Sequence, residues 1–167
     1  LLTKEAYRNN LETTTERMLS GAITRICTTI THGVCAEEQS GGVQHIAYDE
    51  YDSYGNLGRS KNYTQDVQEV YQFDMLDRLT ESAISWISDT SNTKTTYYNY
   101  DASGNLTTKS DFSLNEANAY LYSQNGHAGP NAVTQVKLKD GALGMTGANR
   151  TLDFDYDQNG NMTSKTL

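Results

Sequence analysis

Hydrophobic and polar positions alternate over several short stretches of the chain, and each stretch ends in Asp, Asn and Gly. In YNYDASGNLT the rings of Tyr98 and Tyr100 fall on one face of a strand, because side chains alternate with a period of two. The following Asp101-x-x-Gly104 fits a type I turn, in which Asp accepts hydrogen bonds from backbone N–H groups and Gly takes a positive φ. Leu106 returns toward the aromatic face. The pattern predicts a β-hairpin of the longer-loop type.

This hairpin unit recurs along the chain with an irregular period. EYDSYGNLGRS and FDYDQNGNMTS are close copies, whereas YQFDMLDRLTES has Asp77 in place of the glycine. YLYSQNG and MLSGAITRI are weaker copies, and the glycine positions of the six units lie 22 to 34 residues apart. The repeat residues are Tyr51, Asp52, Gly55, Tyr71, Phe73, Asp74, Tyr98, Tyr100, Asp101, Gly104, Tyr120, Tyr122, Gly126, Phe154, Tyr156, Asp157 and Gly160.

The composition agrees with an all-β fold made of short strands and tight turns. Only 36% of the 167 residues are hydrophobic, but twelve are Tyr, whose ring suits half-buried pleated surfaces. One Pro stands against thirteen Gly. We expect a single segment, 1–167, cut from a longer chain: degenerate repeats in 1–47, regular repeats in 48–122, and a Gly-rich loop with the last repeats in 123–167. Six units predict an open or two-layered sheet that continues at both ends in the parent protein.

The repeated aromatic-x-aromatic-Asp-x-x-Gly-Asn-Leu-Thr unit resembles the YD-repeat, or RHS-repeat, family. The likeness covers the chain from about residue 16 to its end, and NGHAGPNAVTQV, Asn125 to Val136, is similar to a stretch common in RHS proteins. The resemblance implies antiparallel hairpins stacked side by side into a curved strip of sheet, here a segment of a larger hollow shell. It also implies neighbouring repeats of the same polypeptide as partners.

The resemblance also carries functional expectations. In bacterial toxin-complex and RHS proteins the shell encloses a C-terminal toxin domain, and in teneurins a related shell belongs to a cell-surface adhesion protein. A secreted or bacterial cell-surface location follows from the likeness. The C-terminal cleavage region of the family is not recognisable here, so autoproteolysis is not expected of this segment.

Charge and hydropathy exclude two classes of partner. The net charge of −8 argues against nucleic acid, because phosphate binding draws on clustered Lys and Arg. No apolar run approaches the roughly 20 residues that span a bilayer. We therefore expect no nucleic acid and no membrane span in this segment.

One copy of the unit also fits the start of a calcium-binding EF-hand loop. Asp155, Asp157 and Asn159 occupy ligand positions 1, 3 and 5, and Gly160 occupies position 6. Loop position 12, normally Glu, is Thr166, and the other copies keep the turn residues while the ligand positions change. We interpret the stretch as a hairpin turn, with calcium as the alternative.

Two cysteines and two histidines permit a zinc site or a disulfide. Cys27, His32, Cys35 and His45 supply ligand types that zinc uses, but the tight C-x2-4-C knuckle of zinc motifs is missing. A disulfide between Cys27 and Cys35, or two free thiols, are the other interpretations. We expect no metal and no cofactor.

Catalytic motifs are missing from the sequence. No Ser lies in a G-x-S-x-G elbow, and the repeat explains Asp157 as a turn residue rather than half of a carboxylate pair. We expect no enzyme, and two functions remain. One is a structural shell segment around a toxin. The other is an adhesion or glycan-binding surface. A solvent-facing row of rings such as Tyr97, Tyr98 and Tyr100 would favour adhesion, whereas rings buried between sheet layers would favour the shell.

Overall fold

The structure is a computed structural model that describes all residues except 31–32, 34, 36–41, 125–128 and 148–149. In this described part the fold is all-β, as predicted, with thirteen strands, one short 3-10 turn and no α-helix. All register-matched strand pairs are antiparallel. None of the described segments is a helix of the length and hydropathy that crossing a membrane requires.

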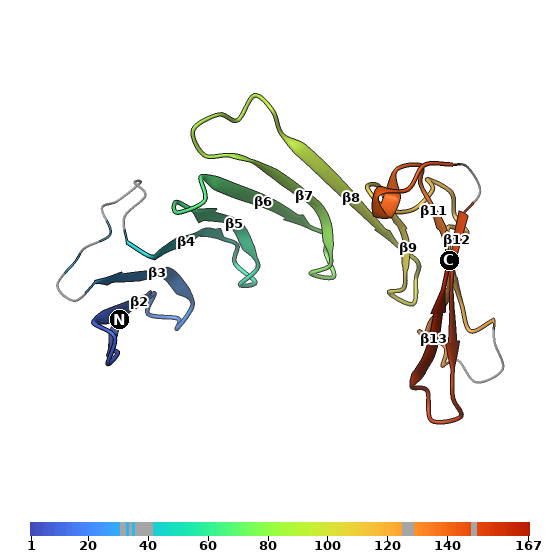
Figure 1. Cartoon of the computed structure of the whole chain (residues 1–167), viewed down its shortest axis with the longest axis horizontal. Helices are drawn as coiled ribbons and strands as arrows, with labels where there is room; N and C mark the ends of the chain where they lie inside the picture. Colours follow the sequence, from blue (N-terminus) through green and yellow to red (C-terminus); the bar gives the residue numbers. More distant parts are fainter. Residues whose placement is uncertain (31–32, 34, 36–41, 125–128, 148–149) are drawn as a thin grey trace. The chain divides into compact units, whose positions relative to one another are not determined.

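The strands form two sheets, each with its strands in sequence order. The order in the first sheet is β1 to β9, and in the second it is β10 to β13, so neither sheet closes on itself. Within each sheet, every strand after the first is thus a neighbour of the one before it (Figure 1). The strands are β1 Leu2–Ala6, β2 Leu11–Arg17, β3 Ile23–Ile30, β4 Gln44–Tyr51, β5 Leu57–Asn62, β6 Val67–Phe73, β7 Leu79–Trp86, β8 Lys94–Tyr100, β9 Leu106–Lys109, β10 Tyr120–Tyr122, β11 Val133–Leu138, β12 Arg150–Tyr156 and β13 Met162–Thr166.

Two compact units divide the chain, Leu1–Thr95 and Thr96–Leu167. In the first unit, most strand residues are half-buried, and Tyr63 is the one buried hydrophobic residue among those described. Large apolar side chains such as Trp86 and Val43 are exposed. This unit therefore depends on the lateral pairing of strands more than on a buried core. The expectation of one continuous repeat segment stays a prediction.

The second unit has a small hydrophobic core. Val136, Leu138, Leu152 and Phe154 are buried together with Ala142 of the 3-10 turn η1, Ala142–Gly144. Alternation along β12 directs Leu152 and Phe154 inward and leaves Asp155 exposed. Half-buried side chains that pack against this cluster are Phe112, Tyr120, Val133 and Tyr156.

Candidate functional site

The repeat unit folds into one defined hairpin turn. Asp101 directly follows β8, and its Oδ1 accepts hydrogen bonds from the backbone N–H groups of Ser103 at 2.8 Å and Asn105 at 2.9 Å. The side chain of Asn105 donates to Oδ2 at 3.2 Å, and the N–H of Gly104 donates to the Asp101 carbonyl at 3.1 Å. Gly104 has φ 86°, as the turn requires. The repeated Asn therefore donates from both its backbone and its side chain to the turn carboxylate. The repeat pattern alone does not indicate this role.

Three other copies repeat this geometry. Asp52 and Asp157 each accept two backbone N–H groups and the side-chain amide of the Asn four residues on. Asp74 accepts the N–H groups of Leu76 and Arg78, and the Arg78 guanidinium replaces the Asn amide. The carboxylate that a calcium ion would need at Asp157 is thus engaged inside the turn. The predicted hairpin turn is confirmed at all four positions.

These hydrogen bonds stabilise the ionised carboxylates. The pKa of Asp101 lies below its ordinary value of 3.8, mainly because the Asn105 backbone N–H donates to the carboxylate. Donation from the side chains of Asn56 and Asn161 lowers the pKa of Asp52 and Asp157, and donation from Arg78 lowers that of Asp74. The negative charge of the turns is therefore retained well into the acid range.

Acid should weaken the turns in a defined pH window. Because the folded pKa of each turn Asp lies below the unfolded value, its contribution is present above about pH 4 and is lost as the pH falls through the folded pKa. We expect a constant thermal midpoint from pH 7 to about pH 5 and a decline below about pH 4. Circular dichroism melts measure this. An Asp52→Asn, Asp101→Asn, Asp157→Asn variant should show a flatter decline, and an equal decline would contradict the assignment.

Asp77 stands where the other copies have glycine, and it is strained. Its φ is 59°, a left-handed conformation that is unfavourable for residues with a Cβ. Its carboxylate accepts a solvent-exposed hydrogen bond from the side chain of half-buried Asn56 at 2.7 Å. The turn therefore forms despite the substitution, since Asp is among the residues that tolerate this region best.

Replacing Asp77 by glycine should stabilise the protein. Relief of the positive φ is expected to exceed the loss of one exposed hydrogen bond, for a net gain of about 0.5 kcal/mol in the free energy of unfolding. Urea denaturation measures the change. Gly104→Ala is the matched opposite, because a Cβ there meets open space and only the φ of 86° opposes it. We expect that variant to lose about 1 kcal/mol; an unchanged Gly104→Ala protein would refute the strain argument.

The repeated Thr of the unit marks a β-bulge. Tyr100 pairs with Leu106 and Asn99 pairs with Thr108, which leaves Thr107 without a cross-strand partner. Thr24, Thr80 and Thr163 are skipped in the same way. From the repeat pattern alone, this Thr has only the role of a β-favouring residue. The register of the hairpin, which the sequence does not display, gives it the position of the extra residue.

The EYDSYGNLGRS copy has glycine where four of the other copies have this Thr. Gly58 lies in the β4–β5 hairpin, which shows no register shift. Instead Glu50, on the facing strand, has φ 61°, and a Cβ on Gly58 would lie 2.3 Å from the Glu50 carbonyl oxygen. The absence of a side chain at Gly58 therefore permits a close backbone approach that replaces the bulge.

The second aromatic residue of the unit ties a hairpin to the chain before it. The Tyr51 hydroxyl donates to the Ile23 carbonyl at 2.7 Å, and the Tyr122 hydroxyl donates to the Leu106 carbonyl at 2.8 Å. Tyr156 donates to the Val133 carbonyl at 2.8 Å. We call these three contacts the tyrosine ties. Burial is the main cause that raises the pKa of Tyr51 and Tyr122, so the hydroxyls remain donors at neutral pH.

Phe73 occupies the same repeat position but has no hydroxyl. Ile23 and Leu106 both follow the turn glycine by two residues, so the equivalent acceptor for Phe73 is the Leu57 carbonyl. A groove of about 690 Å³ is lined by Phe73 and Tyr71 on one side and by Gly58, the residue after Leu57, on the other.

Adding this missing hydroxyl should stabilise the protein. We expect Phe73→Tyr to raise the free energy of unfolding by about 1 kcal/mol, the net value of a typical hydrogen bond. Tyr51→Phe, which removes an existing tie, is the matched reverse and should lower it by a similar amount. Urea denaturation of both variants measures the pair. A Phe73→Tyr protein less stable than the parent would show that the Leu57 carbonyl is not the acceptor.

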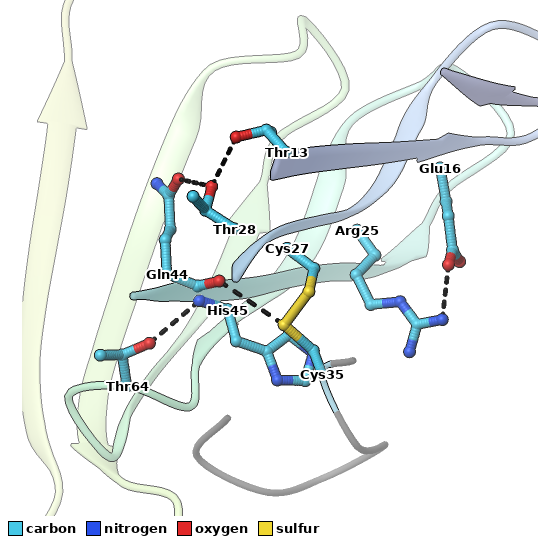
Figure 2. The surroundings of a disulfide bond; sticks show 9 residues. All are labelled: Thr13, Glu16, Arg25, Cys27, Thr28, Cys35, Gln44, His45 and Thr64. Carbon is cyan, nitrogen blue, oxygen red and sulfur yellow. Dashed lines mark hydrogen bonds and ion pairs between the residues drawn. A yellow bond between two sulfur atoms is a disulfide. The ribbon is translucent and has the colours of Figure 1, made fainter. Parts of the chain in front are cut away.

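Cys27 and Cys35 form a disulfide in the structure (Figure 2). Cys27 lies on β3 opposite His45 of β4, and the Cys35 sulfur lies 3.7 Å from the Gln44 carbonyl. His45 is buried with its ring 4.6 Å from that of Tyr63. Zinc sites use Cys as thiolates, whereas these sulfur atoms are bonded to each other. His32, the remaining zinc candidate, lies outside the described residues.

The described residues contain no cluster of side chains that could hold a metal ion. No group of three or more His, Cys, Asp or Glu side chains in that part of the chain is arranged to hold a metal ion.

Of the two weaker repeat copies, the one at Met18-Leu19-Ser20-Gly21 adopts the turn, with the Gly21 N–H donating to the Met18 carbonyl. In the YLYSQNG copy, the Ser123 N–H donates to the Ala132 carbonyl, and Gly126 lies outside the described residues.

The three tyrosines whose joint exposure would favour a glycan-binding surface lie on two different faces of β8. Tyr97 is 51% exposed, whereas Tyr98 and Tyr100, on the opposite face, are half-buried. The Lys109 ammonium lies 5.9 Å from the Tyr98 ring centre. Tyr97 is therefore the aromatic side chain of this strand that offers most of its surface to solvent.

No protein-family model and no curated protein matches the sequence. The resemblance to YD-repeat proteins therefore depends on the repeat residues, whose turn geometry is described above. Family membership stays a prediction.

Proposed function

We propose that this chain is a non-catalytic structural segment of a YD-repeat shell, which encapsulates or displays a C-terminal toxin domain in a bacterial secreted or surface protein. The three tyrosine ties are the observation that carries this proposal. Each joins a repeat hairpin to a carbonyl in the chain before it, so the repeat encodes both a hairpin and its attachment. A wall built from repeated units requires both properties.

The edges of the sheets support a wall that continues. β1 is the first strand of its sheet, and all five of its residues are exposed. β13 is the last strand of the second sheet, and four of its five residues are exposed. An edge strand presents unpaired N–H and C=O groups that accept a further strand. Neighbouring repeats of the parent polypeptide are the partners that we propose for these edges.

Two further features agree with this proposal. The first unit leaves apolar side chains such as Trp86 and Ile84 exposed, as expected of a wall that contacts other parts of a larger protein. The disulfide between Cys27 and Cys35 supports a secreted or surface location, because disulfides persist in oxidising compartments.

Limited proteolysis of the parent polypeptide tests the proposal. We expect the domain that follows the repeats to resist a protease at concentrations that digest the same domain expressed alone. A Tyr51→Phe, Tyr122→Phe, Tyr156→Phe variant should lose this protection, whereas Tyr54→Phe, at an 83% exposed position, should keep it. Equal digestion of the enclosed and isolated domains would refute encapsulation.

A glycan-binding surface is the second candidate function. The exposed Tyr97 ring favours it, since sugars stack their C–H faces on aromatic rings. This function is compatible with the first, because a wall has an outer face. Binding of a saccharide to the isolated chain is its test.

A further inference from the structure

A polar groove adjoins Tyr97 within the second unit. We call it the Tyr97 groove; it has a volume of about 450 Å³. Its walls come from β8, β9, the segment after β9 and the residue that follows β11. The residues of its lining that bear on ligand binding are Tyr97, Asn99, Thr108, Ser110, Asn115 and Lys139.

Two hydrogen bonds hold the backbone of Tyr97 at the groove. The Ser110 N–H donates to the Tyr97 carbonyl at 3.0 Å, and the Tyr97 N–H donates to the Ser110 hydroxyl at 2.9 Å. Half of the Tyr97 side chain nevertheless remains exposed. An aromatic ring with solvent access, carried on a hydrogen-bonded strand, is a stacking surface for a ring-shaped ligand.

Amide groups of the groove have hydrogen-bonding capacity left. Asn99 donates from Nδ2 to the Thr108 hydroxyl at 2.7 Å, and this bond uses neither its carbonyl oxygen nor its second N–H. Asn115 is exposed and has no hydrogen-bond partner among the described residues. Together they offer both donors and acceptors, which is the combination that sugar hydroxyls require.

Lys139 is the charged residue of the groove. Its ammonium donates to the Ser110 carbonyl at 2.9 Å and has no carboxylate partner among the described residues. Lys137 and Lys109, by contrast, pair with Glu116 and Asp111. The contact with Ser110 holds the Lys139 ammonium at the groove and leaves two of its N–H donors for a ligand.

We propose that the Tyr97 groove binds a saccharide that carries a carboxylate. The ring stacks on Tyr97, its hydroxyls bond to Asn99 and Asn115, and the carboxylate pairs with Lys139. This inference rests on the second candidate function and names its ligand class. A single cation suits one carboxylate, whereas the net charge of −8 disfavours a polyanion.

Two matched pairs of sugars test the inference by isothermal titration calorimetry. Sialyllactose is compared with lactose, and methyl glucuronide with methyl glucoside, so that each pair differs in the presence of a carboxylate. We expect the carboxylated member to bind about tenfold more tightly, as one charge-assisted hydrogen bond implies. Lys139→Met should abolish this preference, and Tyr97→Ser should weaken both members.

Matched variants outside the groove serve as controls. Lys165→Met removes a cation from β13, and Tyr54→Ser removes an exposed ring from the β4–β5 turn; neither residue lines the groove. Both variants should bind as the parent does. Should Tyr97→Ser fail to fold, Tyr97→Leu retains an apolar strand residue without the aromatic face, and Asn115→Ala changes an exposed position only.

The outcomes separate the two proposals. Equal binding of the charged and neutral sugars would overturn the carboxylate assignment. Sugar binding that is unchanged in the Tyr97 and Lys139 variants would overturn the groove while leaving a glycan-binding surface elsewhere. Absence of binding for both pairs would overturn the groove and the second candidate function together.

Discussion

Replacing Leu152 by alanine is expected to lower the free energy of unfolding of the second unit by about 3 kcal/mol. Leu152 is 3% exposed and lies in the small core with Val136, Leu138 and Phe154. Loss of its side chain removes apolar contact and leaves a cavity that a core of five buried residues has little means to fill. Hydrogen exchange by mass spectrometry should show faster exchange in peptides covering 133–156.

Met162→Ala is the matched control for this prediction. Met162 lies on the neighbouring strand β13 but is 52% exposed, so truncation creates no cavity. We expect hydrogen exchange in peptides covering 133–156 of the Met162→Ala protein to match that of the parent protein. A Leu152→Ala protein with exchange equal to that of Met162→Ala would show that this core does not hold the second unit together.

Reduction of the disulfide is expected to lower the free energy of unfolding of the first unit by about 2.5 kcal/mol. The bond links residues eight apart in sequence, and closing a loop of that length restricts the unfolded chain by about this amount. The first unit has few buried hydrophobic residues, so this constraint is a large part of its stability. Urea denaturation followed by Trp86 fluorescence, with and without reductant, measures the difference.

A Cys27→Ala, Cys35→Ala variant provides the control for the reductant itself. Its denaturation midpoint should equal that of the reduced parent and should not respond to reductant. Mass spectrometry after thiol alkylation should find both cysteines blocked only once the parent has been reduced. Alkylation of the untreated native protein would show that the bond is absent, and the reductant effect would then have another origin.

The turns were predictable because their interactions are local. Asp101, Gly104 and Asn105 lie within five residues, so spacing alone reveals the hydrogen bonds that they make. Even the exception at Asp77 was visible, although its positive φ was not. The internal copies also separated the turn from a calcium loop, because residues needed for turn geometry recur while other positions vary.

The tyrosine ties and the bulges were not predictable in the same way. Tyr51 and Ile23 are 28 residues apart, and nothing in either local sequence indicates that they meet. The signal that was present, a Tyr before the turn Asp in most copies, was interpreted as an aromatic face. Likewise the repeated Thr was assigned to the strand pattern, since a bulge becomes apparent only when both strands of a pair are aligned.

The sequence by itself determined the all-β fold, the hairpin unit and the positions of its turns, because alternation and turn chemistry act over a few residues. Only the tertiary structure decided which strand lies beside which, what the tyrosine hydroxyls contact and where the buried residues gather. It also placed Tyr97 and Lys139 at one groove. These features depend on contacts between residues far apart in the chain. The alternation of side chains along a single strand does not specify such contacts.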